Sequence, residues 1–284
     1  MANEIEKGAL YVAATPIGNL SDITERAKKV LLEVDFVAAE DTRVSGLLLS
    51  KFNIKKSIIN YFEHNKREAG EKIIAELLSG KSCALVTDAG TPAISDPGTE
   101  LCELAHKNGI KVIPIPGACA AISALCASGF NSRRFIFEGF LPQDNTKDEV
   151  LTSLVNEKRT VIFYEAPHRL TDTLSALLKS AGNREAATVR EITKRYEEVR
   201  HANLEGLLKY YKENPPKGEF VIVVGGMSEE TLRQEEIDNW NSISIEEHME
   251  KYISEGMTEK EAMKKVSKDR GVSKREIYAY LNKD

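Results

Sequence analysis

This sequence of 284 residues lacks the features of membrane, secreted and zinc-binding proteins. It has no apolar run near the roughly 18 residues that a membrane-spanning helix needs, and its first residues, MANEIEKGALYV, are polar and acidic, unlike a signal peptide. The cysteines are few and lack the CxxC spacing of many zinc sites; they are Cys83, Cys102, Cys119 and Cys126. We therefore expect a cytoplasmic protein with reduced cysteines, no membrane contact and no metal ion.

Two common nucleotide-binding motifs are also absent. The loop ATPIGNLSD follows the first apolar run but lacks the GxGxxG pattern of dinucleotide-binding proteins, and no GxxxxGK[ST] sequence occurs anywhere. The sequence therefore gives no support for a dinucleotide fingerprint or a P-loop. Taken alone, TPIGNL is best explained as an ordinary strand-to-helix turn.

An excess of positive charge is missing as well, since the net charge is −5. This balance argues against a protein that coats nucleic acid, although the field near a site depends on where the charges lie. Between Lys260 and Arg275 there are seven Lys or Arg and two acidic residues, a net charge of +5, whereas the segment from Ser228 to Asn241 carries −4. The sequence therefore predicts a basic C-terminal segment preceded by an acidic one.

What the sequence does have is a regular alternation of short apolar runs with longer helical patterns. Runs such as ALYVAAT, DFVAAED and SCALVTD are separated by segments with apolar residues three or four positions apart. This order is typical of βαβ units and a parallel sheet. After Gly117 a second set begins, in which AATVREITKRYEEVRHANL is typical of two strands joined by a tight connection. The second sheet is therefore expected to be mixed or antiparallel.

These patterns predict two α/β domains followed by a small helical module. The module has no strand pattern and is expected to contain a turn at Gly271, after which Ser273 caps the last helix. In the first domain, Asp22 and Glu25 have the spacing of a capping box at a helix start. The expected parts are an N-terminal α/β domain (1–117), a C-terminal α/β domain (118–227), an acidic linker (228–241) and the helical module (242–284).

The stretch LVTDAGTPAISDPG, from Leu85 to Gly98, is rich in turn-forming residues and carries two carboxylates. Its prolines cannot donate to a central strand and its glycines permit positive φ, so the strand must end here. Loops beyond the carboxyl ends of strands are where open α/β sheets bind ligands. We interpret Asp88, at the strand end, as a ligand contact and Asp96 as the cap of a helix that starts at Pro97.

Three more strand ends have the same character. PIPGACAA begins a helix whose small side chains allow close approach of a ligand and whose first N–H groups have no intrahelical partner, although tight packing on the sheet explains the small residues nearly as well. FYEAPHRL places Glu165 close before Arg169, and AAEDTR places Glu40, Asp41 and Arg43 after the second strand. These charges suit acid–base chemistry and anion binding, or else a capped helix start with solvated side chains.

Nine stretches in this order resemble the tetrapyrrole-methylase superfamily of S-adenosylmethionine enzymes, and in particular its branch that methylates small-subunit ribosomal RNA. Each stretch alone is weak evidence, but the ordered set is highly specific. The C-terminal helical segment also resembles the small helical domain of many members. The nine stretches span roughly residues 9 to 226 and read ATPIGNLSDIT, AAEDTR, EHN, DAGTPAISDPG, PIPG, FEGFLP, FYEAPHR, REITKRYEE and KGEFVIVVGG.

The resemblance implies that S-adenosylmethionine lies in a cleft between the two α/β domains. Backbone groups of the loops would hold it, which explains why their Gly, Pro and Ala residues leave no side chain to protrude into the cofactor. The implied reaction is methyl transfer to the ribose 2′-hydroxyl of a cytidine in the decoding region of 16S ribosomal RNA, carried out by a homodimer. The implied cofactor-binding residues are Pro16, Asp88, Ala89, Gly90, Thr91, Pro92, Pro116, Gly117, Ala118, Ala121, Tyr164 and Gly218.

For the chemistry we expect Glu165 to act as the general base, with Glu40 and Asp41 as the next candidates. Two sets of cations are expected to contact RNA, one near the cleft and one on the C-terminal helices. The first set is Arg43, His64, Arg169 and Lys194, and the second is Lys264, Lys265, Lys268, Lys274 and Arg275.

Two alternatives stay open at this point. A methyltransferase for a corrin precursor would share the fold and cofactor but predicts no basic C-terminal helices. A ribosome-binding protein without catalysis predicts damaged cofactor loops. The basic segment argues against the first alternative, and the intact DAGTP and PG sequences argue against the second.

Overall fold

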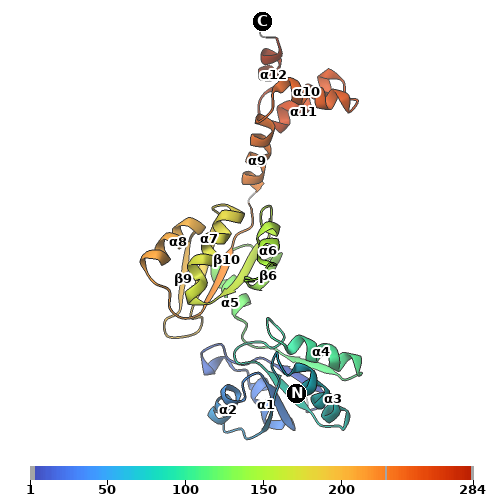
Figure 1. Cartoon of the computed structure of the whole chain (residues 1–284), viewed down its shortest axis with the longest axis vertical. Coiled ribbons are helices and arrows are strands. Elements are labelled where there is room, and N and C mark those ends of the chain that lie inside the picture. Colours follow the sequence, from blue (N-terminus) through green and yellow to red (C-terminus); the bar gives the residue numbers. More distant parts are fainter. Residues whose placement is uncertain (1–3, 228, 283–284) are drawn as a thin grey trace. The chain divides into compact units, whose positions relative to one another are not determined.

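The computed structural model describes residues 4–227 and 229–282. The chain forms two compact units, one made of residues 1–154 and 159–225 and the other of residues 155–158 and 226–284. The first unit holds two five-stranded sheets, and the described part of the second holds four helices (Figure 1). Position 228, where the predicted linker begins, and positions 283 and 284 of the predicted module lie outside the described residues.

The first sheet is entirely parallel, with the strand order β3-β2-β4-β1-β5. The inner strands β1, β2 and β4 are buried along their whole length, which explains why their sequences are uninterrupted apolar runs. The edge strands β3 and β5 are partly exposed. The five strands are β1 (Leu10–Ala13), β2 (Phe36–Ala39), β3 (Ser57–Asn60), β4 (Cys83–Val86) and β5 (Val112–Ile115).

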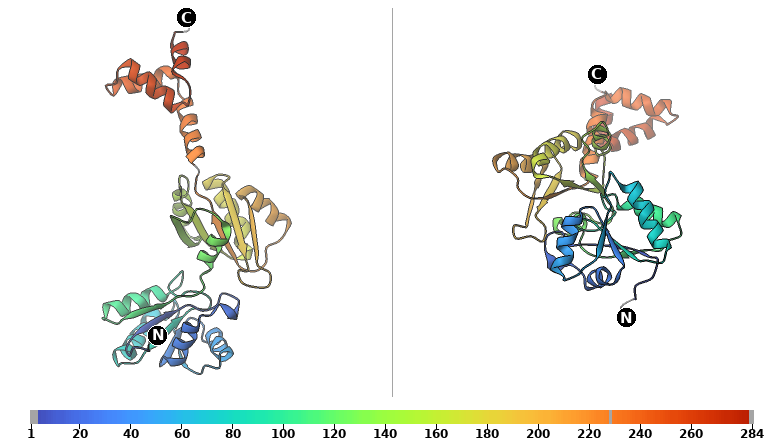
Figure 2. Two further views of the ribbon diagram at one scale, coloured as in Figure 1. Left: turned by 180° about the vertical axis from the view of Figure 1, so that it is seen from behind. Right: turned by 60° about the horizontal axis from the view of Figure 1, so that its bottom comes forward.

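Helices cover both faces of this sheet (Figure 2). Helices α1 and α2 pack on one face; Ala27, Val30 and Leu31 form the i, i+3, i+4 stripe that α1 buries there. Helices α3 and α4 pack on the other face, around Ile73 and Leu101. The helices are α1 (Glu25–Glu33), α2 (Thr42–Lys51), α3 (Lys66–Leu78) and α4 (Gly98–Lys107), with a short 3₁₀ turn η1 (Leu20–Asp22) before α1.

The second sheet is mixed, as predicted. Strands β6 and β7 are parallel, and the pairs β7–β10, β10–β8 and β8–β9 are antiparallel. The predicted pair of strands in AATVREITKRYEEVRHANL is the hairpin β8–β9, in which Arg190 lies opposite Glu198. The strands are β6 (Phe135–Phe140), β7 (Thr160–Glu165), β8 (Glu185–Arg190), β9 (Glu198–Asn203) and β10 (Phe220–Val224).

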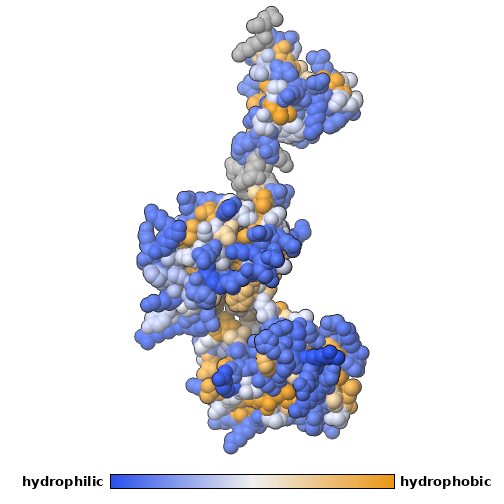
Figure 3. All heavy atoms as spheres, in the orientation of Figure 1, coloured by the Kyte–Doolittle hydropathy of each residue, from blue (hydrophilic) through white to orange (hydrophobic). Residues whose placement is uncertain are grey.

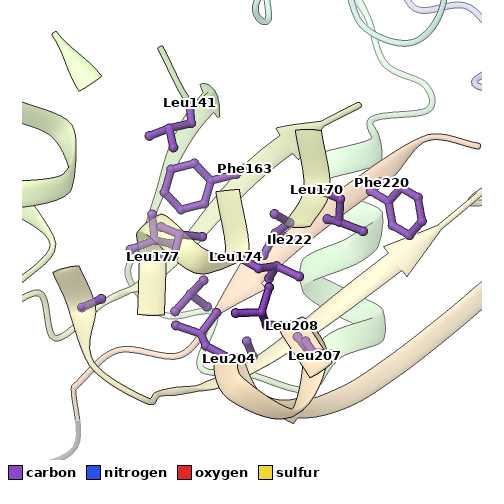
Figure 4. Packing of buried hydrophobic residues seen from close by; sticks show 14 of the residues in the cluster. Leu141, Phe163, Leu170, Leu174, Leu177, Leu204, Leu207, Leu208, Phe220 and Ile222 are labelled. Carbon is purple, nitrogen blue, oxygen red and sulfur yellow. The ribbon is translucent and has the colours of Figure 1, made fainter. Parts of the chain in front are cut away.

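This sheet also lies between helices. The larger core lies under α7 and α8, where Phe163, Leu174 and Ile222 are completely buried (Figure 4). Helix α5 covers the opposite face with Ala121, Ala124 and other small side chains. The visible outer surface around α7 and α8 is mostly hydrophilic (Figure 3). The helices are α5 (Ala120–Ser128), α6 (Lys147–Ser153), α7 (Leu170–Ala181) and α8 (Leu204–Glu213), with a 3₁₀ turn η2 (Pro167–Arg169) before α7.

The second unit is a small bundle with its own core, built around Met249, Val266 and Ile277. Three of its helices begin with a complete capping box, and Ser273 caps α12 as predicted. The predicted acidic linker is helical, because residues 229–241 form α9. The helices are α9 (Glu229–Asn241), α10 (Ile245–Ser254), α11 (Glu259–Asp269) and α12 (Lys274–Leu281).

Aromatic stacking joins α9 to the rest of this bundle. The Trp240 ring lies 3.8 Å from the His248 ring and parallel to it. His248 is fully buried and its Nδ1 accepts a hydrogen bond from Arg270 Nε. Burial and the neighbouring Arg270 lower the pKa of His248, so its ring stays neutral near pH 7.

The starts of α1 and α4 differ from those predicted. The capping box expected at Asp22 is wrong: α1 begins two residues later, and Thr24 is its N-cap, accepting a hydrogen bond from the Ala27 N–H. Asp22 instead ends the 3₁₀ turn η1. The helix expected to start at Pro97 begins one residue later, at Gly98, and Pro97 is its N-cap. Asp96 lies just before this cap, and its Oδ1 still accepts from the N–H groups of Ala93 and Gly98, both at 2.8 Å.

Candidate active site

Three loops at the carboxyl edge of the parallel sheet are joined by hydrogen bonds. The Thr15 N–H donates to the Gly90 carbonyl at 2.8 Å, and the Thr15 hydroxyl lies 3.2 Å from the Thr87 carbonyl. The Thr91 hydroxyl donates to the Ala118 carbonyl at 2.9 Å. The loops after β1, β4 and β5 are thereby fixed as one surface, which is what a binding site made of backbone requires.

Two glycines permit this close approach. Gly90 has φ +92°, and a Cβ placed there would lie 3.2 Å from the Ile17 side chain. A Cβ on Gly117 would lie only 2.7 Å from the Ala14 Cβ, at the end of β1. The sequence suggested that a side chain at position 117 would enter the cofactor cleft. In the structure the Cβ of such a side chain would instead collide with Ala14 in the loop after β1.

The substitution Gly117→Val is therefore expected to force the β1 and β5 loops apart. We expect the free energy of unfolding to fall by about 1–3 kcal/mol, the usual cost of overpacking, and ligand binding at these loops to weaken. Differential scanning calorimetry and isothermal titration calorimetry measure the two effects. A variant with unchanged stability and unchanged affinity would show that the close approach to Ala14 is not needed.

A cavity of about 550 Å³ opens over this surface. The parallel sheet contributes Ala89, Gly90 and Thr91, which were predicted cofactor contacts, and the second sheet contributes Tyr164. Further lining residues come from the loops after β1 and β4, the carboxyl ends of β6, β7 and β8, and the starts of α5 and β10. They include Ile17, Thr87, Cys119, Ala120, Phe140, Val189, Ile192, Glu219, Phe220 and Val221.

Tyr164 joins the second sheet to the start of α5. Its hydroxyl accepts a hydrogen bond from the Ala121 N–H at 3.2 Å. Burial raises the pKa of Tyr164 to about 12, so the phenol is neutral at physiological pH. The ring packs edge-to-face against Phe137 and Phe140. This wall of the cavity is therefore aromatic, rigid and uncharged.

The remaining predicted cofactor residues do not line this cavity. Most lie one or two positions away from residues that do, and their binding of cofactor stays a prediction. Asp88 is different because it lines a second cavity, described below. The predicted residues outside the lining of the larger cavity are Pro16, Asp88, Pro92, Pro116, Gly117, Ala118, Ala121 and Gly218.

The second cavity, of about 460 Å³, lies at the carboxyl ends of β2, β3 and β4. Glu40 lines both cavities. The other lining residues of the second cavity are Asp41, Thr42, Arg43, Asn60, Phe62 and Asp88.

Glu165, the first candidate for the general base, is fully engaged in the structure. Its carboxylate accepts hydrogen bonds from the Thr173 hydroxyl at 2.5 Å and from the Ala166 N–H at 2.8 Å. Arg169 Nε lies 3.3 Å from the same carboxylate, whose side chain has no exposed surface. These contacts suit a carboxylate that positions the 166–169 loop rather than one that accepts a proton from substrate.

Glu40 and Asp41 differ from each other in proton affinity. Glu40 is exposed, but partial desolvation raises the pKa of its carboxyl, and the nearby carboxylates of Asp88, Asp96 and Asp41 raise it further. Hydrogen bonds from Arg43 lower the pKa of Asp41 to about 2. Because a stronger base has the higher pKa, Glu40 is the better proton acceptor of the two.

Of the cations predicted to contact RNA near the cleft, two are free enough to do so. The Arg43 side chain is 86% exposed, although it pairs with Asp41 at 2.7 Å. His64 is exposed beside Phe62. By contrast, Arg169 is held by Glu165 and by the Leu141 carbonyl, which its Nη2 reaches at 2.5 Å.

Lys194 also has a structural role. Its Nζ lies 3.0 Å from a Glu191 carboxylate oxygen and 2.7 Å from a Glu219 oxygen. A Cβ on Gly18 would lie only 2.4 Å from the Lys194 side chain. The ATPIGNLSD loop and the β8–β9 connection are therefore in close contact. We conclude that Lys194 links two loops instead of extending into solvent toward RNA.

The predicted cations of the C-terminal helices are exposed. Lys264, Lys265 and Lys268 lie on α11, and Lys274 and Arg275 begin α12. Arg270, which adds to the positive charge counted in this segment, is buried instead. It donates to the carbonyls of Ile243 and Ser244.

Metal ligands do not converge in the described part of the chain, since no group of three or more His, Cys, Asp or Glu side chains there is placed to hold an ion. All four cysteines are free thiols. None of the described helices is long and apolar enough to cross a bilayer.

Some residues of the two cavities escaped the sequence analysis. Asn60 ends β3 and Phe62 follows it, at the same sheet edge as the other loops, so the carboxyl-end rule applied to SIINYF predicts them. Glu219 and Phe220 could not be found that way, because they begin β10. The antiparallel pairing of Phe220 with Glu165 brings this strand start to the cavity.

A family model described as Tetrapyrrole (Corrin/Porphyrin) Methylases matches residues 9–208. The chain is 49% identical to Ribosomal RNA small subunit methyltransferase I of Halalkalibacterium halodurans over 96% of this chain and 94% of the relative. It is 47% identical to the protein of the same name from Bacillus subtilis, with the same coverage.

Solved structures share the fold at low identity. A cobalt precorrin-4 methyltransferase aligns with a TM-score of 0.59 at 19% identity, covering 78% of this chain and 98% of its own. A uroporphyrin-III C-methyltransferase from Thermus thermophilus, complexed with S-adenosyl homocysteine, aligns with a TM-score of 0.54 at 15% identity, covering 76% and 97%. With the family model and these relatives, the chain belongs to the tetrapyrrole methylase family and, within it, to the ribosomal RNA small subunit methyltransferase I group.

Proposed function

We propose that this protein transfers a methyl group from S-adenosylmethionine to the ribose 2′-hydroxyl of a cytidine in the decoding region of 16S ribosomal RNA. The observation that carries the proposal is the pair of cavities that meet at Glu40. A two-substrate reaction needs two adjacent sites with the reacting groups at their junction. A carboxylate at that junction is placed to accept the proton that the hydroxyl loses.

The larger cavity suits S-adenosylmethionine in size and chemistry. Its 550 Å³ lies within the range of ligand pockets. The Ala89–Gly90–Thr91 backbone offers N–H and carbonyl groups without side chains in the way, and Ile17, Val189 and Val221 offer apolar surface. We infer that these residues hold the cofactor, which supplies a methyl group on a positively charged sulfur.

The chain's own residues then have three tasks. The hydrogen-bonded loops at Thr15 and Thr91 fix the cavity wall before substrate arrives. The apolar and aromatic side chains around Tyr164 keep water from competing with the ribose hydroxyl. Glu40 accepts the proton of that hydroxyl as its oxygen attacks, so positioning and general-base catalysis together lower the barrier.

Binding of S-adenosylmethionine is expected to be independent of metal. Calorimetric titration in the presence of a chelator should give a heat of binding, and saturating cofactor should raise the unfolding temperature. Neither effect at saturating cofactor would contradict the assignment of the larger cavity. Titration of the Gly117→Val variant beside the native protein links the heat to these loops.

The RNA assignment has a separate test in cells. Mapping of ribose methylation on 16S RNA from cells with and without the gene should show one 2′-O-methylcytidine that depends on it. We further propose that the protein acts in the cytoplasm as a homodimer, on 16S ribosomal RNA either free or within the small ribosomal subunit. An unchanged methylation map would contradict the proposed reaction while leaving cofactor binding intact.

One observation favours RNA over a corrin precursor as substrate. The two solved tetrapyrrole methyltransferases leave about a fifth of this chain unmatched, whereas the two ribosomal RNA methyltransferase relatives match 96% of it. The exposed cations of α11 and α12 provide charge suited to an RNA backbone.

A further inference from the structure

The proposed reaction requires a place for the target nucleotide, and the second cavity has walls suited to it. We propose that this cavity holds the flipped-out base of the target nucleotide, with the exocyclic amine of a cytosine directed to Asp88. The inference rests on the proposed function and deepens it, because it names the group that selects the base.

The second cavity lies next to the methyl-donor cavity. Because Glu40 lines both cavities, a base in the second cavity places its own ribose close to Glu40 and to the methyl-donor cavity. Enzymes that do chemistry on a base take it out of its stack into such a pocket, and we infer the same for a nucleotide whose ribose is methylated here. The second cavity is large enough, at about 460 Å³, to hold a nucleoside.

The walls offer the contacts that recognise an unstacked base. Phe62 provides an aromatic surface for stacking, and Asn60 provides an amide that both donates and accepts. Their loop is held in place, since the Phe62 N–H donates to Asn65 Oδ1 at 2.8 Å and Asn65 Nδ2 donates to the Asn60 carbonyl at 3.0 Å. The stacking surface is therefore formed before RNA binds.

The carboxylates determine which base fits. Arg43 occupies the Asp41 carboxylate through two side-chain hydrogen bonds, at 3.1 and 2.7 Å. Asp88 Oδ1 accepts the Asp41 N–H at 3.2 Å, and its Oδ2 has no hydrogen-bond partner among the described residues. A carboxylate accepts from the N4 amine of cytosine. Uracil has the O4 carbonyl in place of this amine, and a carbonyl cannot donate a hydrogen bond to the Asp88 carboxylate.

The same charges argue against other occupants. Three carboxylates repel a phosphate group inside the cavity, so a phosphate suits the rim, where Arg43 is exposed. A metal ion does not fit either, because the acidic side chains in the described residues do not converge as a ligand set.

The test compares cytidine with uridine at the target position. Small subunits are reconstituted with 16S RNA carrying either nucleotide at the methylated site, and transfer of labelled methyl is measured for each. The native protein is expected to favour cytidine in kcat/KM by roughly 5- to 150-fold, the fold-change that corresponds to one good base contact. Asp88→Asn keeps an acceptor for the Asp41 N–H but presents an amide donor to the base, so it should shift the ratio at least tenfold toward uridine.

Matched variants separate base reading from general damage. Glu68→Gln removes an exposed carboxylate outside both cavities and should leave the ratio unchanged. Phe62→Leu should raise the KM for RNA with either nucleotide while the affinity for S-adenosylmethionine stays the same. Equal effects of Asp88→Asn on both RNAs, or none, would overturn the inference alone. Failure of the native protein to methylate either RNA would overturn the proposed function with it.

Discussion

Replacing Glu40 by glutamine is expected to lower kcat for RNA methylation by roughly 10²–10⁴-fold, the usual contribution of a positioned general base. Glutamine keeps the size and hydrogen-bonding reach of glutamate but cannot take up the proton of the ribose hydroxyl. Because glutamine has the same size and polarity at this position, the affinity for S-adenosylmethionine should change little. Single-turnover methylation and calorimetric titration of the same preparation measure both quantities.

The pH dependence gives this prediction a second readout. A general base works only when it is deprotonated, so kcat should rise with pH through the pKa of Glu40. Partial desolvation and the neighbouring acidic groups raise that pKa, so the rise of kcat should lie at higher pH than an ordinary glutamate would give. In Glu40→Gln this rise should disappear. If the Glu40→Gln variant keeps the native kcat and the native rise of kcat with pH, Glu40 is excluded as the base.

Glu165→Gln is the matched comparison. Its hydrogen bonds with Thr173 and Ala166 and its contact with Arg169 predict a loss of stability, visible as a lower unfolding temperature. The acidic limb of the kcat profile should remain. If Glu165→Gln removes the limb and Glu40→Gln keeps it, the original ranking of the two carboxylates is correct.

The sequence located the loops of the candidate site well because their signals are local. Asp88, Gly90 and Pro92 end a buried strand, and any parallel sheet collects such strand ends at one edge. The helix start near Asp96 was also predictable, because an Asp followed by Pro suits a helix start, although the helix begins one residue later than expected, at Gly98. These features depend on residues within a few positions of each other.

The roles of single charged residues were less predictable because they depend on distant partners. Glu165 accepts from Thr173, eight residues away, across a turn whose geometry the sequence does not specify. Lys194 packs against Gly18 from the opposite part of the chain. A charge that looks solvated in the sequence is thus neutralised in the fold. Arg270 shows the same effect, since it is counted in a basic surface segment but is buried.

The C-terminal helices carry the second large expected effect. We propose that Lys264, Lys268, Lys274 and Arg275, which are exposed and have no ion-pair partner in the described part of the chain, neutralise RNA phosphates. Replacing all four by glutamine preserves helix propensity and removes the charge. If each contacts one phosphate, the slope of log affinity for RNA against log salt concentration should become shallower by roughly three.

A matched charge change separates this role from general electrostatics. Glutamine at Lys7, Lys55, Lys72 and Lys209, all exposed on the α/β unit, alters the net charge of the chain equally. If the effect is local, only the C-terminal variant should lose RNA affinity and salt dependence, because charges beyond the Debye length of about 10 Å at 0.1 M salt are screened. Its affinity for S-adenosylmethionine should be native. Equal slopes for both variants would mean that α11 and α12 do not hold the RNA backbone, and that the target reaches Glu40 through contacts of the α/β unit alone.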